Sequence, residues 1–590
     1  MTIFEFRTLN PNPEPLILSN LSSKFPLYNE YLFENFLVSL QKLFIVIKII
    51  TIMSTHKLNH QCHCCPQCSE EPSSESMEKI SRRNFVAMGG VLLGGLTLAG
   101  LRSNIFAAET ERNSVFTAVA DESVLSPTPR KPLIVKPILV YDLPESRNQT
   151  SWRNWGGIHS KETVQEEAGR IQTELAILKA RADYPVEFLD ISSVTDINQM
   201  KGHPDMSKCD TILLYGAGFA VNGVQDFGKD VIFFQRWRSG PVYLQYEIVS
   251  PRFLRQHTDA IVVPGICHSD IVTDKTEELD WRFRSLCGLK NTMASKIVTI
   301  GGAGGWGQPN GVVPELVKKI WKFEYHDVSY DELGKLIDEA KADTKVMEKA
   351  KKRAGDYLKI PGTKLETKED FLVCCFVLDE VFRLIMKKVD TNLITVNSCM
   401  SAIMPKSKTT ACFTLTTLND DGYLAFCESD FVAIPSGVLL GNISGKPVFL
   451  ANPTYPHDNI ITISHCTAPR KMNGKNYDPV RIVTHFESDY GAAPWVDAPL
   501  GTVTTHIGPD FKSERWIGLK GKIVEVPFRP ICRTQFDIQY EVSDRLLAER
   551  APGFHWMTCY GDYRKEIGYA LRRTGIKWDN LDEVPTKEMS

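Results

Sequence analysis

The chain has 590 residues, of which 43% are hydrophobic and 24% charged, and its formal net charge is −3. That length exceeds what a single hydrophobic core usually supports, so two or three domains are expected. The composition is that of an ordinary globular protein, and the small net charge gives no electrostatic reason to expect binding to nucleic acid or to a membrane surface.

Residues 1–80 are expected to form a disordered leader. Their apolar stretch Phe36–Met53 contains lysines and makes a poor membrane span, so we interpret Met53 or Met77 as the natural first residue. The cluster Cys62–Cys68 could bind a metal ion, but its spacing is too tight for a standard two-knuckle zinc site, and an incidental cluster is the favoured interpretation. The other eleven cysteines are dispersed through the body of the chain, which predicts buried thiols rather than a disulfide framework.

Residues 81–108 have the pattern of an export signal. Ser81-Arg-Arg-Asn-Phe85 is basic, Val86–Leu101 is apolar and rich in glycine, and small residues follow at Ala107 and Ala108. Such a series is typical of a signal peptide, and paired arginines before a large apolar residue indicate the twin-arginine (Tat) type. We therefore expect export by the Tat machinery to the periplasm or another extracytoplasmic space, with a short membrane anchor, an uncleaved signal, as the alternative.

Residues 109–130 are polar, with Ser, Thr and Pro, and predict a linker. In residues 131–313 strand patterns alternate with helix patterns, which predicts βαβ units with a largely parallel sheet and helices on both faces. Residues 314–365 have charged residues and alanine at helical spacing and predict connecting helices. The elements expected before residue 314 are a helix at Ser160–Arg181 and strands at Leu133–Tyr141, Val186–Ile191, Thr211–Tyr215, Ile261–Pro264 and Lys296–Ile300.

Residues 366–585 predict a second domain of mixed α/β type, and the chain shows no internal repeat. The expected helices are Phe371–Met386, Phe431–Leu440 and Tyr563–Arg573. The expected strands are Leu393–Val396, Gly422–Phe426, Pro447–Leu450, Ile460–Ile463 and several more between residues 480 and 540.

Two acidic and two imidazole side chains stand at the ends of expected strands in this domain: Glu428, Asp430, His465 and His555. On a strand, the spacing of Glu428 and Asp430 places both carboxylates on one face, where they repel unless a cation or a shared proton relieves them. Alternatively, Asp430 simply caps the helix that follows, and either histidine taken alone is more simply explained as a hydrogen-bonded core residue. Together, these oxygen and nitrogen ligands suit a divalent ion such as Mn²⁺, beside which a carboxylate can carry protons.

Two loops offer further candidates. Gly302-Ala-Gly-Gly-Trp-Gly307 follows an expected strand and fits a dinucleotide fingerprint, with Glu324 at a plausible distance, which supports the alternative of a nucleotide-dependent oxidoreductase. Against that alternative, Pro309–Gly311 delay any helix, so a bound phosphate would lack a helix N-terminus. His268 and Asp270 follow another expected strand; His268 could contact substrate from a neighbouring domain or subunit, although a solvated loop is the simpler interpretation.

Roughly residues 132–585 resemble the L-fucose/L-arabinose isomerase superfamily. The similarity is carried by Leu418–Asp430, Gly445–Asn452, Ser464–Pro469 and Phe554–Asp562. Members of this family bind Mn²⁺ between carboxylates and histidine and interconvert aldose and ketose sugars through an enediol. The resemblance therefore implies N-terminal flavodoxin-like subdomains with a doubly wound parallel sheet, a C-terminal isomerase domain, a monosaccharide substrate and a homo-oligomer.

By this resemblance Glu428 or Asp430 ligates the metal and one of them carries the proton, His555 completes the ligand set, and His465 is a ligand or binds sugar hydroxyls. The family usually has a further acidic residue on an earlier strand, where this chain has Asn397, which we count as substrate-binding. An amide ligates a metal weakly and cannot act as a base. Catalysis by two carboxylates therefore requires Glu428 and Asp430 to divide the roles between them. The sequence thus predicts an exported, Mn²⁺-dependent, sugar isomerase-like protein, with a non-catalytic carbohydrate-binding relative as the first alternative.

Overall fold

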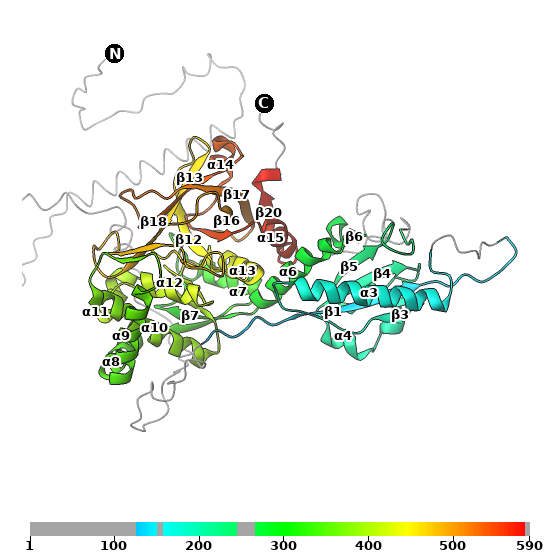
Figure 1. Ribbon diagram of the computed structural model, residues 1–590, viewed down its shortest axis with the longest axis horizontal. Helices are drawn as coiled ribbons and strands as arrows, with labels where there is room; N and C mark the ends of the chain where they lie inside the picture. The colour runs from blue at the N-terminus through cyan, green and yellow to red at the C-terminus, as the bar shows by residue number, and fades with distance from the viewer. Residues whose placement is uncertain (1–125, 150–156, 245–265, 584–590) are drawn as a thin grey trace, which may run out of the picture. The chain divides into compact units, whose positions relative to one another are not determined.

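The computed structural model describes residues 126–149, 157–244 and 266–583 (Figure 1). Contacts divide the chain into residues 1–109 and Thr110–Ser590, and every described residue belongs to the second unit. The expected leader, the twin-arginine signal, the Cys62–Cys68 cluster, most of the linker and the expected strand at Ile261–Pro264 lie outside the described residues. Within the described ranges, no helix combines the length and the apolar character that a membrane span requires.

The first sheet consists of six parallel strands, as the alternating pattern predicts. Its order is β2-β1-β4-β5-β6, with β3 also paired to β1. With β3 left out, this is the 2-1-3-4-5 order of flavodoxin-like sheets, but β4 connects to β5 through the 3-10 helix η4 rather than an α-helix, so the match is partial. The elements are β1 (Leu133–Tyr141), α3 (Lys161–Arg181), β2 (Val186–Phe188), β3 (Ser192–Val194), η3 (Ile197–Met200), α4 (Pro204–Lys208), β4 (Thr211–Ala217), η4 (Val224–Phe227), β5 (Asp230–Gln235), η6 (His268–Asp270), β6 (Ile271–Thr273) and α6 (Glu277–Thr292).

Strand β1 shows why this sheet is covered on both faces. Val135 and Leu139 pack into a cluster with apolar residues of α3 and α6, whereas Ile138 and Val140 pack into a second cluster with residues of η3 and α4. Successive side chains of a strand point to opposite faces, so the nearly continuous apolar run of β1 supplies both clusters. Burial on both faces is characteristic of parallel sheets.

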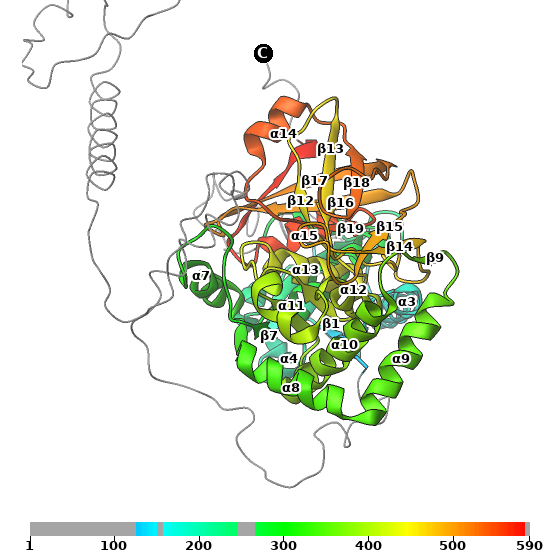
Figure 2. The ribbon, with the colours of Figure 1, turned by 90° about the vertical axis from the view of Figure 1, so that its left-hand side faces the viewer.

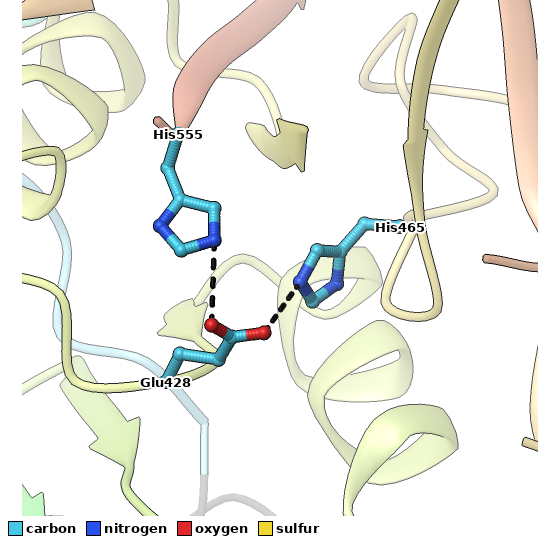
Figure 3. A group of neighbouring side chains, drawn as sticks. All are labelled: Glu428, His465 and His555. Atoms are coloured by element: carbon cyan, nitrogen blue, oxygen red, sulfur yellow. Dashed lines mark hydrogen bonds and ion pairs between the residues drawn. The ribbon is translucent and has the colours of Figure 1, made fainter. Parts of the chain in front are cut away.

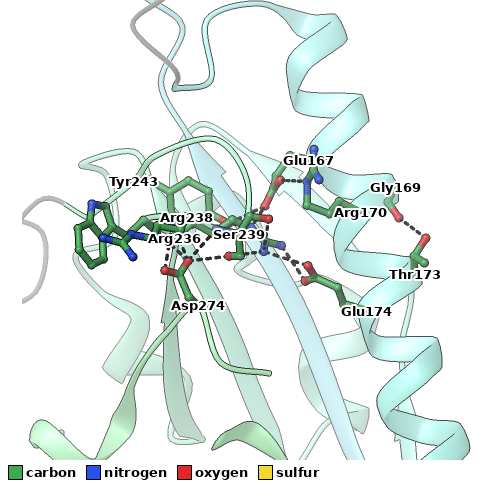
Figure 4. Close-up of polar contacts among 11 residues, drawn as sticks. Glu167, Gly169, Arg170, Thr173, Glu174, Arg236, Arg238, Ser239, Tyr243 and Asp274 are labelled. Atoms are coloured by element: carbon green, nitrogen blue, oxygen red, sulfur yellow. Dashed lines mark hydrogen bonds and ion pairs between the residues drawn. The ribbon is translucent and has the colours of Figure 1, made fainter. Parts of the chain in front are cut away.

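A buried ion network fastens α3 to the end of β5 (Figure 4). Arg236 donates to Glu167 and, with two nitrogens, to Glu174, and the Tyr243 hydroxyl donates to the same Glu167 oxygen. Arg236 and Glu167 are almost completely buried, and their charges are satisfied by several hydrogen bonds, as burial of an ion pair requires. Asp274 accepts hydrogen bonds from the three backbone N–H groups that follow Arg236, so the carboxyl end of β5 is held on two sides.

The second sheet has four parallel strands in the order β11-β10-β7-β8. From β7 the chain passes to β8 on one side, and from β10 it passes to β11 on the other. The topological switch point therefore lies between β7 and β10, and ligands of α/β proteins bind at the carboxyl ends of the strands at such a point. The elements are β7 (Lys296–Ile300), α7 (Val312–Trp321), β8 (Glu324–Val328), α8 (Tyr330–Ala342), α9 (Thr344–Leu358), α10 (Glu369–Val389), β10 (Leu393–Val396), η7 (Cys399–Ile403), α11 (Met404–Ser407), α12 (Cys412–Asp420), β11 (Leu424–Phe426) and α13 (Ile434–Ser444).

The third part is an antiparallel barrel that the sequence pattern did not predict. Strands β16, β19, β12, β13, β18 and β17 pair in that order and β17 pairs back with β16, which closes six strands, while β20 pairs in parallel with β17. In both ribbon views, the barrel strands lie at one end of the part of the chain that follows β7, and helices α8 and α9 lie at the other end (Figure 2). The barrel elements are β12 (Phe449–Pro453), β13 (Ile460–His465), β16 (Val503–Pro509), β17 (Arg515–Glu525), β18 (Thr534–Gln539), β19 (Trp556–Tyr560) and β20 (Lys577–Asn580). A separate sheet of three strands comprises β9 (Thr363–Leu365), β14 (Val480–Val483) and β15 (Ala493–Val496). The remaining helices are α14 (Asp544–Arg550) and α15 (Arg564–Leu571), and α15 contacts α6 and β20.

The mixed α/β prediction is confirmed, and individual elements differ from expectation for identifiable reasons. Strands β1, β7 and β10 have the predicted bounds. The expected run of helices at 314–365 is interrupted by β8, an edge strand whose polar sequence lacks the apolar signal of a strand. The expected strand at Val186–Ile191 ends at Phe188. Helix α12 was not predicted, because every one of its residues is buried and the sequence therefore shows no amphipathic period.

Candidate metal centre

The candidate site lies at the carboxyl edge of the second sheet. The glycine-rich loop follows β7, Asn397 follows β10 and Glu428 lies just beyond β11. His465 ends β13 and His555 immediately precedes β19, so both imidazoles come from the barrel. Strands β13 and β19 flank β12. On β12, Asn452 pairs with Ser464, which precedes His465. Ala451 pairs with Trp556, which follows His555. The register of β12 therefore brings the two histidines to nearly the same level.

Glu428 lies between the two histidines (Figure 3). Its Oε1 is 3.4 Å from His465 Nε2, and its Oε2 is 3.4 Å from His555 Nε2. The ligand atoms of the three side chains all lie within 4.8 Å of one another. Both histidines are buried, whereas 30% of the Glu428 side chain is exposed. One carboxylate and two imidazoles thus form a candidate metal-binding triad in which the carboxylate is the most accessible member.

The other nitrogen of each imidazole faces an acceptor. His555 Nδ1 is 2.7 Å from Asp430 Oδ2, and His465 Nδ1 is 3.1 Å from Thr467 Oγ1. An acceptor at Nδ1 favours the tautomer that leaves the Nε2 lone pair available to a metal ion. His555 Nε2 is buried and has no hydrogen-bond partner, which is unusual for a polar atom unless it serves as a ligand. These residues therefore fit a divalent cation.

Asp430 was predicted as a metal ligand and an acid/base residue, and the structure places it outside the triad. Its Oδ1 accepts hydrogen bonds from the backbone N–H groups of Trp306 and Val432, while its Oδ2 faces His555. The side chain thus caps the turn before α13, whereas the N-cap of the helix itself is Ala433, and it also contacts His555. The role of Asp430 as a metal ligand stays a prediction.

The backbone conformation explains why Glu428 and Asp430 do not share a face. Strand β11 ends at Phe426, and Glu428 and Ser429 have φ values of 64° and 46°. Non-glycine residues adopt this left-handed region rarely and at a cost, so the alternation expected of a strand does not apply here. The strained segment is held in place by Gly304, whose N–H donates to the carbonyl of Ser429. Two such residues in succession at the candidate ligand are consistent with a functional site.

The glycine-rich loop contributes to this centre rather than presenting a free phosphate cradle. The backbone N–H groups of Gly304 and Trp306 donate to Ser429 and Asp430, and the carbonyl of Gly304 accepts from the N–H of the residue after Asp430. Helix α7 begins only at Val312. N–H groups that a nucleotide phosphate would need are therefore engaged within the chain, and no helix N-terminus directly follows the loop.

Glu428 and His555 have opposite pKa shifts. Burial by itself would raise the pKa of Glu428, but its close contacts with His465 and His555 and the charges of these rings hold it well below its ordinary value. Burial likewise lowers the pKa of His555, and its contacts with Asp430 and Glu428 outweigh burial and raise it to about 9. Binding of a metal ion at this site would therefore be coupled to release of the His555 proton. Burial raises the pKa of nearby Cys399 to about 11, so this thiol is neutral and does not add a thiolate ligand.

Of the three predicted substrate-binding residues, His465 belongs to the triad, and Asn397 and His268 lie outside it. Asn397 lies beside Gly304, at the same sheet edge as the triad, and its Oδ1 accepts from the N–H of the next residue. His268 is exposed on η6 of the first sheet. Its neighbour Asp270 is buried and forms an ion pair with Arg572, so this loop is tied to the end of the chain rather than solvated throughout.

The sequence interpretation missed three residues of the centre. Thr467 fixes His465 and stands only two positions after it. Trp306 belongs to the glycine-rich loop, whose sequence fits a dinucleotide fingerprint. Phe554 directly precedes His555, and its ring stacks on Trp306 with centroids 3.7 Å apart and planes within 5°. A polar residue two positions from a histidine and an aromatic residue beside a histidine were the available signals.

One carboxylate and two imidazoles with open coordination positions suit Mn²⁺, Fe²⁺ or Zn²⁺. None of the eleven cysteines in the described part of the chain forms a disulfide, and most of them are buried, as expected from their dispersed spacing. A comparison of the sequence with protein-family models and with curated proteins returned no match.

Proposed function

We propose that this is a metal-dependent, sugar isomerase-like protein whose centre is Glu428, His465 and His555. The observation that carries this proposal is that a carboxylate and the Nε2 atoms of two imidazole rings converge. The Nδ1 atom of each ring faces a hydrogen-bond acceptor. Such a donor set suits Mn²⁺. A bound divalent cation would polarise the carbonyl and the adjacent hydroxyl of a monosaccharide.

In this proposal Glu428 is the acid/base residue for aldose–ketose interconversion through an enediol. It is the most exposed member of the triad, and its depressed pKa keeps it deprotonated at neutral pH. A carboxylate held at the reacting carbons can accept a proton from one carbon and return it to the next. Asp430 would act only by positioning His555.

A carbohydrate-binding protein without turnover is the second candidate, and two observations favour it. Asn397 stands where the isomerases usually have an acid, and Asp430 is engaged with His555 and two backbone N–H groups. Glu428 is therefore the only carboxylate of the triad, and a carboxylate with so low a pKa is a weak base. The third candidate, a nucleotide-dependent oxidoreductase, has less support because its glycine-rich loop is engaged within the chain.

The proposal also covers the N-terminal part of the chain, the oligomeric state and the cellular location. The order of the first sheet supports flavodoxin-like N-terminal subdomains. The resemblance to the isomerase superfamily implies a homo-oligomer. The paired arginines of Ser81–Phe85 support Tat export to the periplasm or another extracytoplasmic space. Because that pathway carries folded proteins, the cation would be loaded before export.

The proposal is tested with purified full-length chain, Mn²⁺ and a panel of aldoses. We expect stoichiometric Mn²⁺ binding that is at least about tenfold weaker in His465→Gln, because one of three protein ligands is lost. Conversion of an aldose to its ketose should be lost in Glu428→Gln, whereas His203→Gln, which changes an exposed histidine at the start of α4, should behave as wild type. Sugar binding without turnover would favour the second candidate, and absence of metal binding by the wild type would overturn the proposal.

A further inference from the structure

Two aromatic rings form a layered pair next to the triad. The rings of Trp306 and Phe554 stack with centroids 3.7 Å apart and planes within 5°. Trp306 also meets His555 edge to face, at 6.4 Å between centroids and 79° between planes. Trp306 is 38% exposed although it is large and apolar. Phe554 covers one face of the indole, so the exposed area lies on the rest of the ring system. The same indole contacts His555 of the triad.

This pair is fixed to the metal centre through the backbone. The N–H of Trp306 donates to Asp430 Oδ1 at 3.0 Å, and the other oxygen of Asp430 holds His555. Phe554 is the residue before His555 in the chain. Gly305, the residue before Trp306, packs closely on Val313, since a Cβ on Gly305 would lie 2.8 Å from the side chain of Val313. The indole is therefore held at a set position relative to the triad and does not have to be ordered when a ligand binds.

The combination selects a particular kind of ligand. The face of an aromatic ring is electron-rich, so it attracts the polarised C–H groups of a sugar ring and repels an anion. The triad, in contrast, calls for hydroxyl oxygens on the ligand. A cyclic monosaccharide offers hydroxyls at its edge and a flat C–H face, whereas an acyclic polyol has no fixed face and loses rotational freedom on binding.

We propose that Trp306, backed by Phe554, is a stacking platform that binds a monosaccharide in its ring form beside Glu428, His465 and His555. This inference rests on the proposed function and adds the form in which the sugar is first bound. It makes Trp306 a specificity residue: the ring form docks on the indole, and opening of the ring follows docking.

The test measures binding of aldopentoses, aldohexoses and the matching alditols to the Mn²⁺-loaded full-length chain by calorimetry, together with Mn²⁺ affinity for every variant. Trp306→Leu should weaken aldose binding about tenfold, because a stacked face and its buried area are lost, and Trp306→Phe should restore most of it. Trp237→Leu is the matched control, since Trp237 is 52% exposed in the loop that follows β5. Alditols should bind more weakly than aldoses to the wild type and be insensitive to Trp306→Leu.

The outcomes separate this inference from the proposed function. Aldose binding by Trp306→Leu at wild-type affinity would overturn the platform and leave the metal-dependent function standing. Loss of Mn²⁺ affinity in both Trp306 variants would also overturn it, because Trp306 would then act by supporting His555. A wild type that binds Mn²⁺ but no sugar would overturn both proposals at the sugar step, and one that binds no Mn²⁺ would overturn the proposed function at the metal step.

Discussion

Substituting Asp430 by asparagine changes one atom of the contact that orients His555. The Oδ1 position accepts two backbone N–H groups, so the amide oxygen of the new side chain must stay there and its NH₂ group must take the place of Oδ2. That NH₂ would face His555 Nδ1 at the 2.7 Å contact and can only donate. Nδ1 would then have to accept, and the ring proton would move to Nε2, which faces Glu428. In this tautomer His555 cannot bind a cation through Nε2.

The expected loss of metal affinity follows from this tautomer. A carboxylate that orients a ligand histidine typically contributes about 10–100-fold to metal affinity, so Asp430→Asn should cost about 1–3 kcal/mol of metal-binding free energy. Burial lowers the pKa of His555, but Asp430 and Glu428 outweigh burial and raise it to about 9, so a proton competes with the cation in the wild type. The titration is therefore made at pH 8, where this competition is weaker than at neutral pH.

Calorimetric titration with Mn²⁺ at pH 8, together with thermal unfolding, measures this prediction. Asp343→Asn is the matched control, because Asp343 caps α9 and asparagine caps helices equally well, so neither affinity nor Tm should change. Thr467→Val should have a smaller effect, about threefold, because it removes a neutral acceptor at 3.1 Å. A folded Asp430→Asn protein with wild-type Mn²⁺ affinity would refute the reasoning, because the carboxylate would then not determine the tautomer.

Three further results are expected. Burial raises the pKa of Asp420 from 3.8 to about 7, so the folded chain holds this proton more tightly than the unfolded chain and stability falls as pH rises from about 4 to 7. Asp420→Asn should therefore add about 2–4 kcal/mol at pH 8 and flatten the pH dependence of Tm, and an unchanged slope would contradict this. A Cβ at Gly288 would lie 2.3 Å from Ile443 Cγ1 and 2.9 Å from the Ile443 backbone, so Gly288→Ala should cost about 1–3 kcal/mol in denaturant unfolding. Gly355→Ala in α9 meets no atom within 4 Å and should instead stabilise by about 0.5–1 kcal/mol; equal effects would argue against the close packing of α6 on α13. Mn²⁺ at a hundredfold excess over Kd should raise the apparent stability of the wild type by about 2.7 kcal/mol, reversibly with a chelator, and a comparable rise in His465→Gln would count against the triad.

Much of the local structure could be predicted because its signals lie within short segments. Ser160 caps α3 and the apolar run of β1 fills both faces of the first sheet, and each of these patterns spans only a few residues. The polar strand β8 and the fully buried helix α12 were missed, because tertiary contacts override a weak or absent local period. The closed barrel was also missed, since its pairing joins strands far apart in the chain.

For the centre, the sequence by itself determined which residue types stand at the ends of strands, and it singled out Glu428, Asp430, His465 and His555 among them. Only the tertiary structure decided that Asp430 turns away from the triad, through the left-handed backbone at Glu428 and a contact with His555 across 125 positions of the chain. The level at which the two histidines meet is likewise a property of strand register in the barrel. Residue type is a local quantity, whereas the direction of a side chain depends on backbone dihedrals and pairings that distant segments impose.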